Sequence, residues 1–268
     1  MKFSVVTISY NQAQFLGRAI SSVLGQTGVE IDYVVVDPGS TDGSREIIEL
    51  NRDRIAHIIY EKDAGPADGL NKGFALATGE IYCYLNSDDE FEPGAFQTIA
   101  DYFISHPDVD VVCGHCWLID EEGRRLRRVW SDPFRRKIVA YGGAIQIQPS
   151  TYIRARAFRG INGFNTRNRI SWDGELLLDL ALNGARIEVI DKFISLYRVH
   201  PLSITGAALH QDRQTEWTTV RFERLMGRRW RFYDNLIAKF VFVVRQIRNP
   251  SAFFERLLHG KVSGRAAV

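Results

Sequence analysis

The feature that most constrains the fold is an alternation of short apolar segments with helical segments in the first 85 residues. The apolar segments are rich in valine and isoleucine, whereas the segments between them repeat apolar residues every three or four positions. We expect strands at residues 3–9, 31–36, 55–60 and 80–85, and helices at 15–24, 44–51 and 67–77. Elements that alternate at this spacing form right-handed crossovers onto a parallel sheet. The sequence therefore predicts an α/β fold with a Rossmann-like, mostly parallel central sheet flanked by helices.

The remaining residues predict a second half of the same domain and a helical tail. We expect helices at 95–105 and 175–183, strands at 109–113, 187–190 and 195–199, a hairpin-like segment at 117–137 that turns at 120–123, and a strand followed by a loop at 141–160. A chain of 268 residues can hold one large α/β domain with an appendage. We place the domain at 1–210, with halves at 1–100 and 101–210, and a basic helical C-terminal extension at 211–268.

The charge of the chain is distributed unevenly. From Arg221 onward there are eleven Lys and Arg against three Asp and Glu, a net charge of +8, which leaves −6 for residues 1–220 of a chain with a net charge of +2. A basic, aromatic-rich tail favours contact with an anionic membrane surface or with a partner. A helical extension with solvated arginines is an equally good interpretation. The arginines at 124–137 do not form a recognised nucleic-acid-binding motif, so a nucleic-acid partner is not expected.

The sequence favours a cytoplasmic location, with peripheral contact at the inner face of the cell membrane. The apolar run at residues 4–9 is too short for a signal peptide, and the most apolar late segment, 236–244, is interrupted by Lys239. The cysteines at 83, 113 and 116 form no disulfide framework, which is typical of a reducing compartment. We expect them to pack in the core rather than to bind zinc.

Polar loops follow three of the predicted parallel strands. They hold Tyr10, Asp37 and the adjacent pair Asp88 and Asp89. Because the carboxyl ends of parallel strands meet at one edge of a sheet, these side chains should lie together where such folds bind ligands. Two adjacent carboxylates repel one another unless a cation lies among them, and a divalent ion that carries phosphates supplies one. The alternative is that each loop is an ordinary capped or acidic turn.

Four motifs in this order resemble family 2 glycosyltransferases of the GT-A fold. They are Ser4-Val-Val-Thr-Ile-Ser-Tyr-Asn11, Val35-Val-Asp-Pro-Gly-Ser-Thr-Asp-Gly43, Ala77-Thr-Gly-Glu80 and Leu85-Asn-Ser-Asp-Asp89. The likeness is strong over about the first 100 residues and looser over 140–200. A Rossmann dehydrogenase would need G-x-G-x-x-G after the first strand, and residues 9–14 contain no glycine.

The resemblance implies a nucleotide-sugar donor and a divalent metal. Thr7, Tyr10 and Asp37 would hold the nucleoside of a UDP-, GDP- or dTDP-sugar. Asn86-Ser-Asp88 stands in the place of the family's D-x-D, so Ser87 and Asp88 would bind the donor. Asp88 would ligate Mg²⁺ or Mn²⁺, with Asp89 as second choice.

A further segment resembles a subset of the family. Residues 61–72 resemble an E-x-D-x-G-x-x-D-A-x-N-x-G run that borders the donor phosphates and sugar, with Asp68 and Lys72 as the candidates and Asp63 behind them. Helix capping by the same aspartates is the alternative.

The resemblance also implies an acceptor side in the second half. Asp173 falls where the family places a general base, and Glu175 is the second candidate. An inverting transfer needs one such carboxylate to deprotonate the acceptor hydroxyl. Trp172 could stack on a sugar, Gln148 could line the acceptor pocket, and His200 could reach the diphosphate or metal. The alternatives are an N-cap for Asp173 and a structural histidine at 200.

The sequence thus predicts a metal-dependent, inverting glycosyltransferase that moves a sugar to a glycan or lipid-linked acceptor, as in surface polysaccharide biosynthesis. There are two departures from the family, Asn86 for the first carboxylate of D-x-D and Pro38 for a frequent second aspartate. They favour an alternative, a non-catalytic nucleotide-binding or assembly subunit with the same fold. They also leave the base of the donor undetermined.

Overall fold

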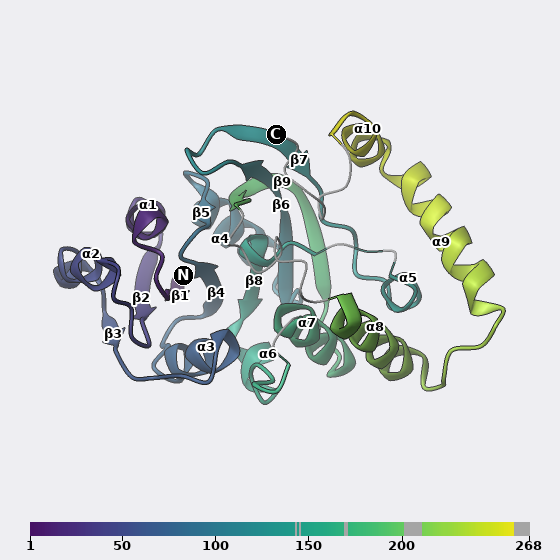
Figure 1. Cartoon of the computed structure of the whole chain (residues 1–268), viewed down its shortest axis with the longest axis horizontal. Coiled ribbons are helices and arrows are strands. Elements are labelled where there is room, and N and C mark those ends of the chain that lie inside the picture. The colour runs from purple at the N-terminus through teal and green to yellow at the C-terminus, as the bar shows by residue number, and fades with distance from the viewer. Residues whose placement is uncertain (143, 145, 169–170, 201–210, 260–268) are drawn as a thin grey trace.

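The computed structural model describes residues 1–142, 144, 146–168, 171–200 and 211–259. Within them, nine strands form one curled sheet in the order β3-β2-β1-β4-β8-β6-β9-β5, with β7 paired to β6 (Figure 1). The strands are β1 (Lys2–Ile8), β2 (Glu30–Val36), β3 (His57–Ile59), β4 (Ile81–Asn86), β5 (Glu90–Phe91), β6 (Val111–Ile119), β7 (Arg125–Val129), β8 (Thr151–Arg154) and β9 (Ile187–Arg198).

The first half of the sheet is parallel, as predicted. β1 pairs in parallel with β2 and β4, and β2 pairs in parallel with β3. The last residue of β1, Ile8, lies opposite both Val36 and Asn86, so three strands end at the same level. The loops that follow them are therefore neighbours at one edge of the sheet.

The second half makes the sheet a mixed one. β8 runs antiparallel between β4 and β6, β5 and β7 pair antiparallel with β9 and β6, and β9 runs parallel to β6. The prediction of two short strands at 187–190 and 195–199 was wrong, because β9 is one strand of twelve residues. Its register shifts against β6 around His115, and the polar residues Asp191 and Lys192 in that bulged stretch resemble a turn in the sequence.

Helices cover both faces of the sheet (Figure 1). They are α1 (Ala13–Leu24), α2 (Ser44–Glu49), α3 (Pro66–Ala75), α4 (Ala95–Ser105), α5 (Arg136–Ala140), α6 (Ala155–Arg159), α7 (Trp172–Leu182), α8 (Gln211–Met226), α9 (Asp234–Arg248) and α10 (Pro250–His259), with 3₁₀ turns at Arg52–Arg54 and Gln148–Ser150. The loop predicted after a strand within 141–160 is in fact the 3₁₀ turn, β8 and α6.

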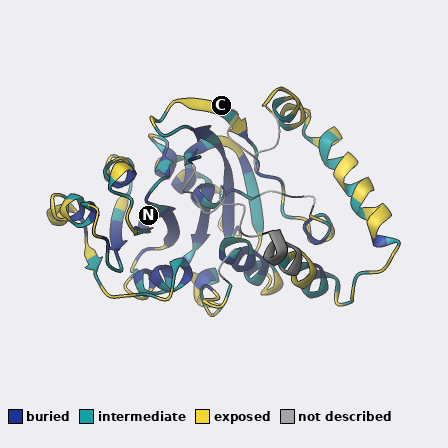
Figure 2. Cartoon of the chain, in the orientation of Figure 1, coloured by how far each residue is buried: buried dark blue, intermediate teal, exposed yellow. Residues whose placement is uncertain are grey.

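Alternation along the strands divides the core between the two faces. Val5 packs in one cluster with α1, α2 and α4, whereas its neighbour Val6 packs in the other with α3, α6 and α7. The central strands β1, β4 and β6 are almost wholly buried in consequence (Figure 2). All three cysteines are buried and free, and burial raises the pKa of their thiols.

The C-terminal helices pack on the outside of the domain. Phe222 and Leu225 of α8 pack with Val139 and Ala140 of α5 and Leu178 of α7. α9 then runs along the outer side of the molecule to α10 (Figure 1). The predicted boundary at 210 falls on residues 201–210, outside the described part of the chain. Among the described helices, none is long and apolar enough to cross a membrane.

The contact of α3 with β1 yields a test of the fold. A Cβ on Gly73 would lie 2.4 Å from Cγ1 of the buried Val6, so Gly73→Ala should lower the free energy of unfolding by about 1–3 kcal/mol. The matched control is Gly17→Ala in α1, where a Cβ would lie 3.9 Å from Cγ2 of Ile47, an ordinary van der Waals distance. That substitution should raise the free energy of unfolding by about 0.5–1 kcal/mol, because alanine restricts the unfolded chain. Urea unfolding measures both, and equal effects would contradict the packing.

Candidate functional site

The loops after β1 and β2 are joined to each other by hydrogen bonds. The backbone N–H of Asn11 donates to Oγ of Ser40 at 2.8 Å, and Oδ1 of Asn11 accepts from the N–H of Thr41 at 2.9 Å. Asp42 accepts from the N–H of Ala13 at 2.8 Å, at the first turn of α1. Asn11 itself has a φ of 51°, the left-handed conformation that asparagine tolerates. The two strand ends therefore form one rigid platform.

Asp37 lies buried at the end of β2. Its Oδ1 accepts from the N–H groups of Gly39 and Ser40, at 3.0 and 2.8 Å, and from Nε of Arg45 at 3.2 Å. Its Oδ2 is buried and accepts no hydrogen bond within the described residues. The guanidinium of Arg45 also lies 4.6 Å from the centre of the Tyr60 ring. One carboxylate oxygen thus fixes the loop, and the other retains its capacity to accept.

The two remaining candidates on β1 and its loop differ in access. Thr7 is fully buried, and its Oγ1 accepts from the hydroxyl of Tyr33 at 3.0 Å. Thr7 therefore lies beneath the platform rather than on it. Tyr10 is 62% exposed, so its ring is available to a planar ligand.

The segment before α3 holds the predicted phosphate-side residues. Oδ2 of Asp68 accepts from the N–H of Ala64 at 2.9 Å, and Nζ of Lys72 lies 3.9 Å from carboxylate oxygens of both Asp68 and Glu61. Asp63 accepts from the N–H of Gly65 at 2.9 Å, and burial raises the pKa of its carboxyl. Asp68 and Asp63 thus hold the turn, while Lys72 supplies a cation beside it.

The two adjacent carboxylates that follow β4, those of Asp88 and Asp89, point in different directions. Asp89 turns inward, where Oδ1 accepts from the N–H of Arg198 at 3.0 Å, and burial raises the pKa of its carboxyl well above the usual range. Nδ2 of Asn86 donates to Oε1 of Gln148 at 2.9 Å, and Gln148 donates in turn to the carbonyl oxygen of Tyr84. Ser87 is buried, with its N–H bonded to the carbonyl oxygen of Ile8.

Asp88 is the carboxylate at this strand end that keeps access to solvent. Its side chain is 18% exposed, and its Oδ2 lies 3.0 Å from Nε2 of His200. The ring of His200 is buried and packs 4.8 Å from the ring of Phe15 in α1. His200 follows β9, so the structure brings together two of the predicted metal residues from opposite halves of the chain. The described residues contain no group of three or more His, Cys, Asp or Glu placed to hold an ion.

Arg198, at the end of β9, binds the backbone of the Asp88 loop from the buried side. Its fully buried guanidinium donates to the carbonyl oxygens of Asp88, Asp120 and Glu121, at 2.9, 2.6 and 3.0 Å, and pairs with Glu90. It also lies 4.9 Å from the ring centre of Phe15. The sequence analysis missed this residue as a site component, although a lone arginine at the end of an apolar strand is a signal, because charge is costly to bury.

Helix α7 carries three of the candidates for the acceptor side, and Asp173 is the one whose carboxylate is not engaged by another side chain within the described residues. Asp173 is partly buried, accepts from the N–H of Gly174 at 2.8 Å, and has a pKa raised by burial. Burial also raises the pKa of Tyr84, and the charge of Asp173 raises it further, which puts Asp173 near β4. Ser171, not Asp173, occupies the N-cap of α7.

Trp172 and Glu175 do not agree with their predicted roles. Trp172 is buried in the core, with its ring 5.6 Å from those of Tyr84 and Phe164, so it cannot stack on a sugar there. The carboxylate of Glu175 accepts from Nδ2 of Asn165, from Nδ2 of Asn168 and from Arg224 of α8. Its oxygens thus tie α7 to its surroundings, which leaves Asp173 as the base candidate.

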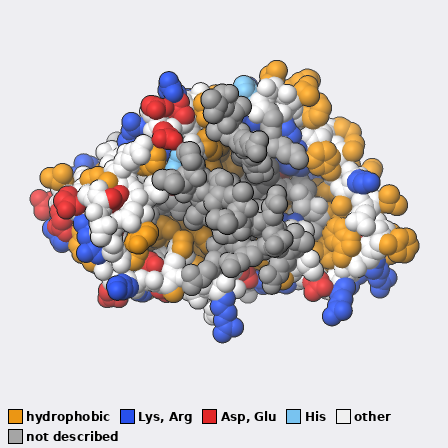
Figure 3. Space-filling model, in the orientation of Figure 1, with side chains coloured by type: hydrophobic (Ala, Val, Ile, Leu, Met, Phe, Trp, Pro, Cys, Tyr) orange, Lys and Arg blue, Asp and Glu red, His pale blue; other side chains and the backbone are white. Residues whose placement is uncertain are grey.

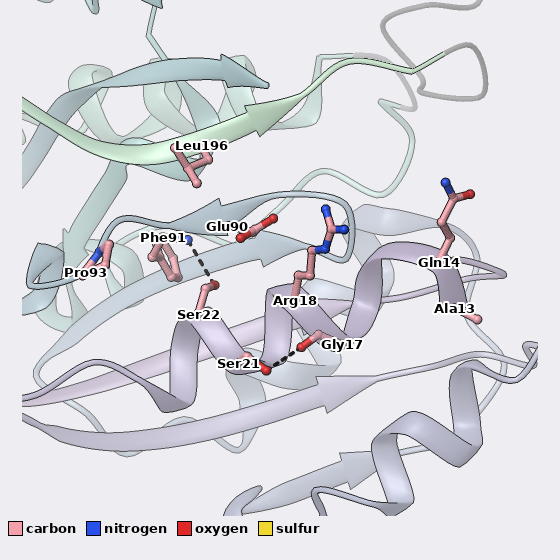
Figure 4. Close-up of a pocket in the computed structure, with 10 residues that line it drawn as sticks. All are labelled: Ala13, Gln14, Gly17, Arg18, Ser21, Ser22, Glu90, Phe91, Pro93 and Leu196. Carbon is pink, nitrogen blue, oxygen red and sulfur yellow. Dashed lines mark hydrogen bonds between the residues drawn. The ribbon is translucent and has the colours of Figure 1, made fainter. Parts of the chain in front are cut away.

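A cavity of 630 Å³ lies beside this arrangement rather than within it. It is lined by α1 and by β5 and its flanks, with Arg18, Glu90 and Leu196 among its residues (Figure 4). None of the predicted donor or acceptor residues lines it. Arg18 also donates to the carbonyl oxygen of Glu121, so this cavity lies on the outer side of the turn that Arg198 holds.

The fold and the strand-end site agree with comparisons to known proteins. Residues 4–163 match glycosyl transferase family 2, and the chain belongs to this family of nucleotide-sugar-dependent glycosyltransferases. An uncharacterized glycosyltransferase of Nostoc sp. is 32% identical over 81% of this chain and 71% of its own length. The chain covers only 40% of the uncharacterized glycosyltransferase YibD of Escherichia coli, at 27% identity.

Solved structures confirm the GT-A fold. Residues 1–349 of TarS from S. aureus, in complex with UDP-GlcNAc, superpose with a TM-score of 0.68 at 20% identity, over 98% of this chain and 76% of that one. The mannosyltransferase PcManGT of Pyrobaculum calidifontis, in complex with GDP-Man and Mn²⁺, superposes with a TM-score of 0.63 at 16% identity, over 97% of this chain and 76% of that one.

The buried guanidinium of Arg198 yields a second prediction. Arg198→Gln should lower the free energy of unfolding by about 3–5 kcal/mol, because it leaves Glu90 and several carbonyl oxygens buried without their donor. Arg124→Gln is the matched control, since Arg124 pairs with Asp120 of the same turn but is exposed. Its denaturant midpoint should stay close to that of the parent protein. Similar midpoints for the two variants would show that Arg198 does not hold the loop.

Proposed function

We propose that the protein is a metal-dependent, inverting glycosyltransferase. The observation that carries the proposal is the placement of Asp88, partly exposed and 3.0 Å from His200, where the ends of β1, β2 and β4 meet. A carboxylate and an imidazole at the edge of a parallel sheet, beside a platform of fixed loops, can receive the diphosphate of a nucleotide sugar. The family membership and the nucleotide sugars bound by TarS and PcManGT support this interpretation.

The nucleoside would bind on the platform. Tyr10 offers an exposed ring for stacking, and Oδ2 of Asp37 can accept from a ribose hydroxyl or a base N–H. Lys72 would lie toward the phosphates, with Asp68 fixing the turn from which it projects. Thr7 would support the platform from below. UDP-, GDP- and dTDP-sugars all present the groups that these residues can bind.

Asp88 and His200 would hold Mg²⁺ or Mn²⁺ together with the donor phosphates. The two side chains fit such an ion, since both metals bind few protein ligands at sites completed by phosphates and water. Asp89 is unsuited, because its carboxylate is buried and bonded to the backbone of Arg198. The ion would neutralise charge on the leaving diphosphate.

Asp173 would act as the base. It would take the proton of the acceptor hydroxyl while that oxygen attacks the anomeric carbon and the bond from this carbon to the diphosphate breaks. Gln148 would line a neighbouring acceptor site, since it bonds to Asn86 on the donor side and to the backbone of Tyr84 in β4.

The acceptor would be a glycan or a lipid-linked sugar at the cytoplasmic face of the membrane, in surface polysaccharide biosynthesis. A putative teichuronic acid biosynthesis glycosyltransferase of Bacillus subtilis, TuaG, is 35% identical over 33% of this chain and 36% of its own length. A polymer of related chemistry is therefore the first acceptor class to try.

The role of Asp88 predicts the outcome of a hydrolysis assay. A thermal-shift screen of UDP-, GDP- and dTDP-sugars with Mn²⁺ first identifies the donor, because a bound ligand raises the melting temperature. Asp88→Ala should then lower hydrolysis of that donor by about 10²–10³-fold, as expected when charge stabilisation of the leaving group is lost. Asp53→Ala, at an exposed aspartate remote from the strand ends, is the control and should retain full turnover. Unchanged turnover in Asp88→Ala would refute the proposal.

The role of Asp173 predicts a pH dependence. Burial raises the pKa of Asp173 above its ordinary value of 3.8, and the base acts only when deprotonated. The transfer rate of the parent protein should therefore rise with pH through this raised pKa. Asp173→Asn should lower transfer by about 10²–10⁴-fold and abolish that rise, while the donor still shifts the melting temperature. Donor binding without any turnover in the parent protein would instead support the non-catalytic alternative.

A further inference from the structure

Helix α9 turns two ion-paired residues toward the protein and most of its large apolar side chains toward the outside. Asp234 is buried, accepts from the hydroxyl of Tyr141 at 2.7 Å and pairs with Arg228. Nε of Arg245, three turns later on the same side, lies 2.9 Å from Oδ2 of Asp132. A surface helix of a water-soluble domain normally shows the reverse pattern.

The opposite side of α9 is an exposed apolar stripe. Leu236, Phe240, Val243 and Ile247 recur every three or four residues, so they lie on one face of the helix. Their exposed fractions run from 52% to 74%. Figure 3 shows apolar side chains along the outer edge formed by α9, with Lys and Arg among them. Figure 2 shows the same helix as mostly exposed.

Helix α10 repeats the inverted pattern. Glu255 turns inward to Nε of Arg128 at 3.1 Å, and burial lowers the pKa of Arg256, which lies close to Arg245 and Asp132. Four large apolar side chains of α10 are exposed: Phe253, Phe254, Leu257 and Leu258. Phe232, just before α9, is exposed in the same way.

The charges around these apolar residues have one sign. In residues 227–259 the carboxylates are Asp234 and Glu255, and both turn inward. The exposed charged residues of this segment include Arg229, Arg231, Lys239 and Arg248. The outward surface of residues 227–259 is therefore apolar and cationic, since neither carboxylate of that segment is exposed.

We propose that this tail surface binds an anionic lipid bilayer. It consists of the exposed apolar residues Phe232, Leu236, Phe240, Val243, Ile247, Phe253, Phe254, Leu257 and Leu258, with the cations Arg229, Arg231, Lys239 and Arg248. The apolar side chains enter the boundary of the acyl chains, and the cations meet lipid phosphates. Arg245–Asp132 and Arg128–Glu255 tie the inner side of both helices to the domain, so the surface is held outward.

A lipid surface fits this chemistry better than a second copy of the chain. A symmetric dimer brings the same patch of both copies together, and the four cations would then face one another without carboxylates. None of the residues of the tail surface belongs to the proposed donor or acceptor site. The inference therefore stands apart from the proposed catalytic function, and a binding assay tests it without turnover.

Sedimentation with vesicles is the test. The full chain should sediment with vesicles of phosphatidylglycerol and phosphatidylcholine, and far less with phosphatidylcholine alone. Phe240→Glu should weaken binding at least about tenfold, because it replaces an aromatic ring that would be buried among the acyl chains with a carboxylate. Lys239→Gln and Arg248→Gln together should weaken it by about fivefold per charge, and high salt should do the same.

Ile104→Glu is the matched control, since Ile104 in α4 is 67% exposed and Phe240 is 68% exposed. It should bind vesicles as the parent protein does, and thermal unfolding checks that each variant is folded. Failure of the parent chain to bind, or equal binding by Phe240→Glu, overturns the proposal. A parent chain that stays off vesicles and elutes as a dimer, which Phe240→Glu converts to a monomer, would assign the surface to a second copy.

Discussion

A single buried guanidinium, that of Arg198, connects the parts of the molecule on which the site depends. It joins the end of β9 to the carbonyl oxygen of Asp88 in the loop after β4 and to the turn between β6 and β7. Burying a charge without partners would cost far more than the fold can supply, so these contacts come as a set. The position of Asp88 relative to His200, two residues beyond Arg198, follows from that constraint.

Asp88 and Asp89 are adjacent and identical in type, but the backbone of Arg198 binds only Asp89, so the two carboxylates differ in their surroundings. Asp89 is buried against the backbone of Arg198, whereas Asp88 keeps partial access to solvent and faces His200. Asn86 turns to Gln148 rather than adding a third carboxylate. This strand end therefore presents one partly exposed carboxylate and one imidazole, and the proposed metal would need phosphate and water ligands in addition to them.

In α9 and α10, ion-paired residues face the domain and large apolar side chains face outward. Their charged residues pair with Asp132 and Arg128 on the domain, so ion pairs help to orient these two helices, whereas α8 packs through apolar side chains. The apolar stripe of α9 lies outside as a result. The proposed donor site and the proposed membrane-binding surface share no residue, so a substitution in one can be tested without changing the other.

The motifs allowed the placement of the strand-end residues to be predicted. The parallel pairing of β1, β2 and β4, the loops at their ends, and the candidates Tyr10, Asp37 and Asp88 all follow local sequence, because strand–helix alternation and residue type are local properties. The roles of Trp172 and Glu175 could not be read this way. Their burial depends on Phe164, Asn165 and Arg224, which come from other segments.

What the sequence by itself determined is the family, the α/β half-fold and the order of its functional loops, since each is encoded in short segments. What only the tertiary structure decided is which side chains remain available. Arg198, Gln148 and Asp132 act across large sequence separations, and desolvation and ion pairing at such contacts have no local signature. The tail shows this most clearly, because composition reveals that it is basic and apolar, but only packing reveals which side faces out.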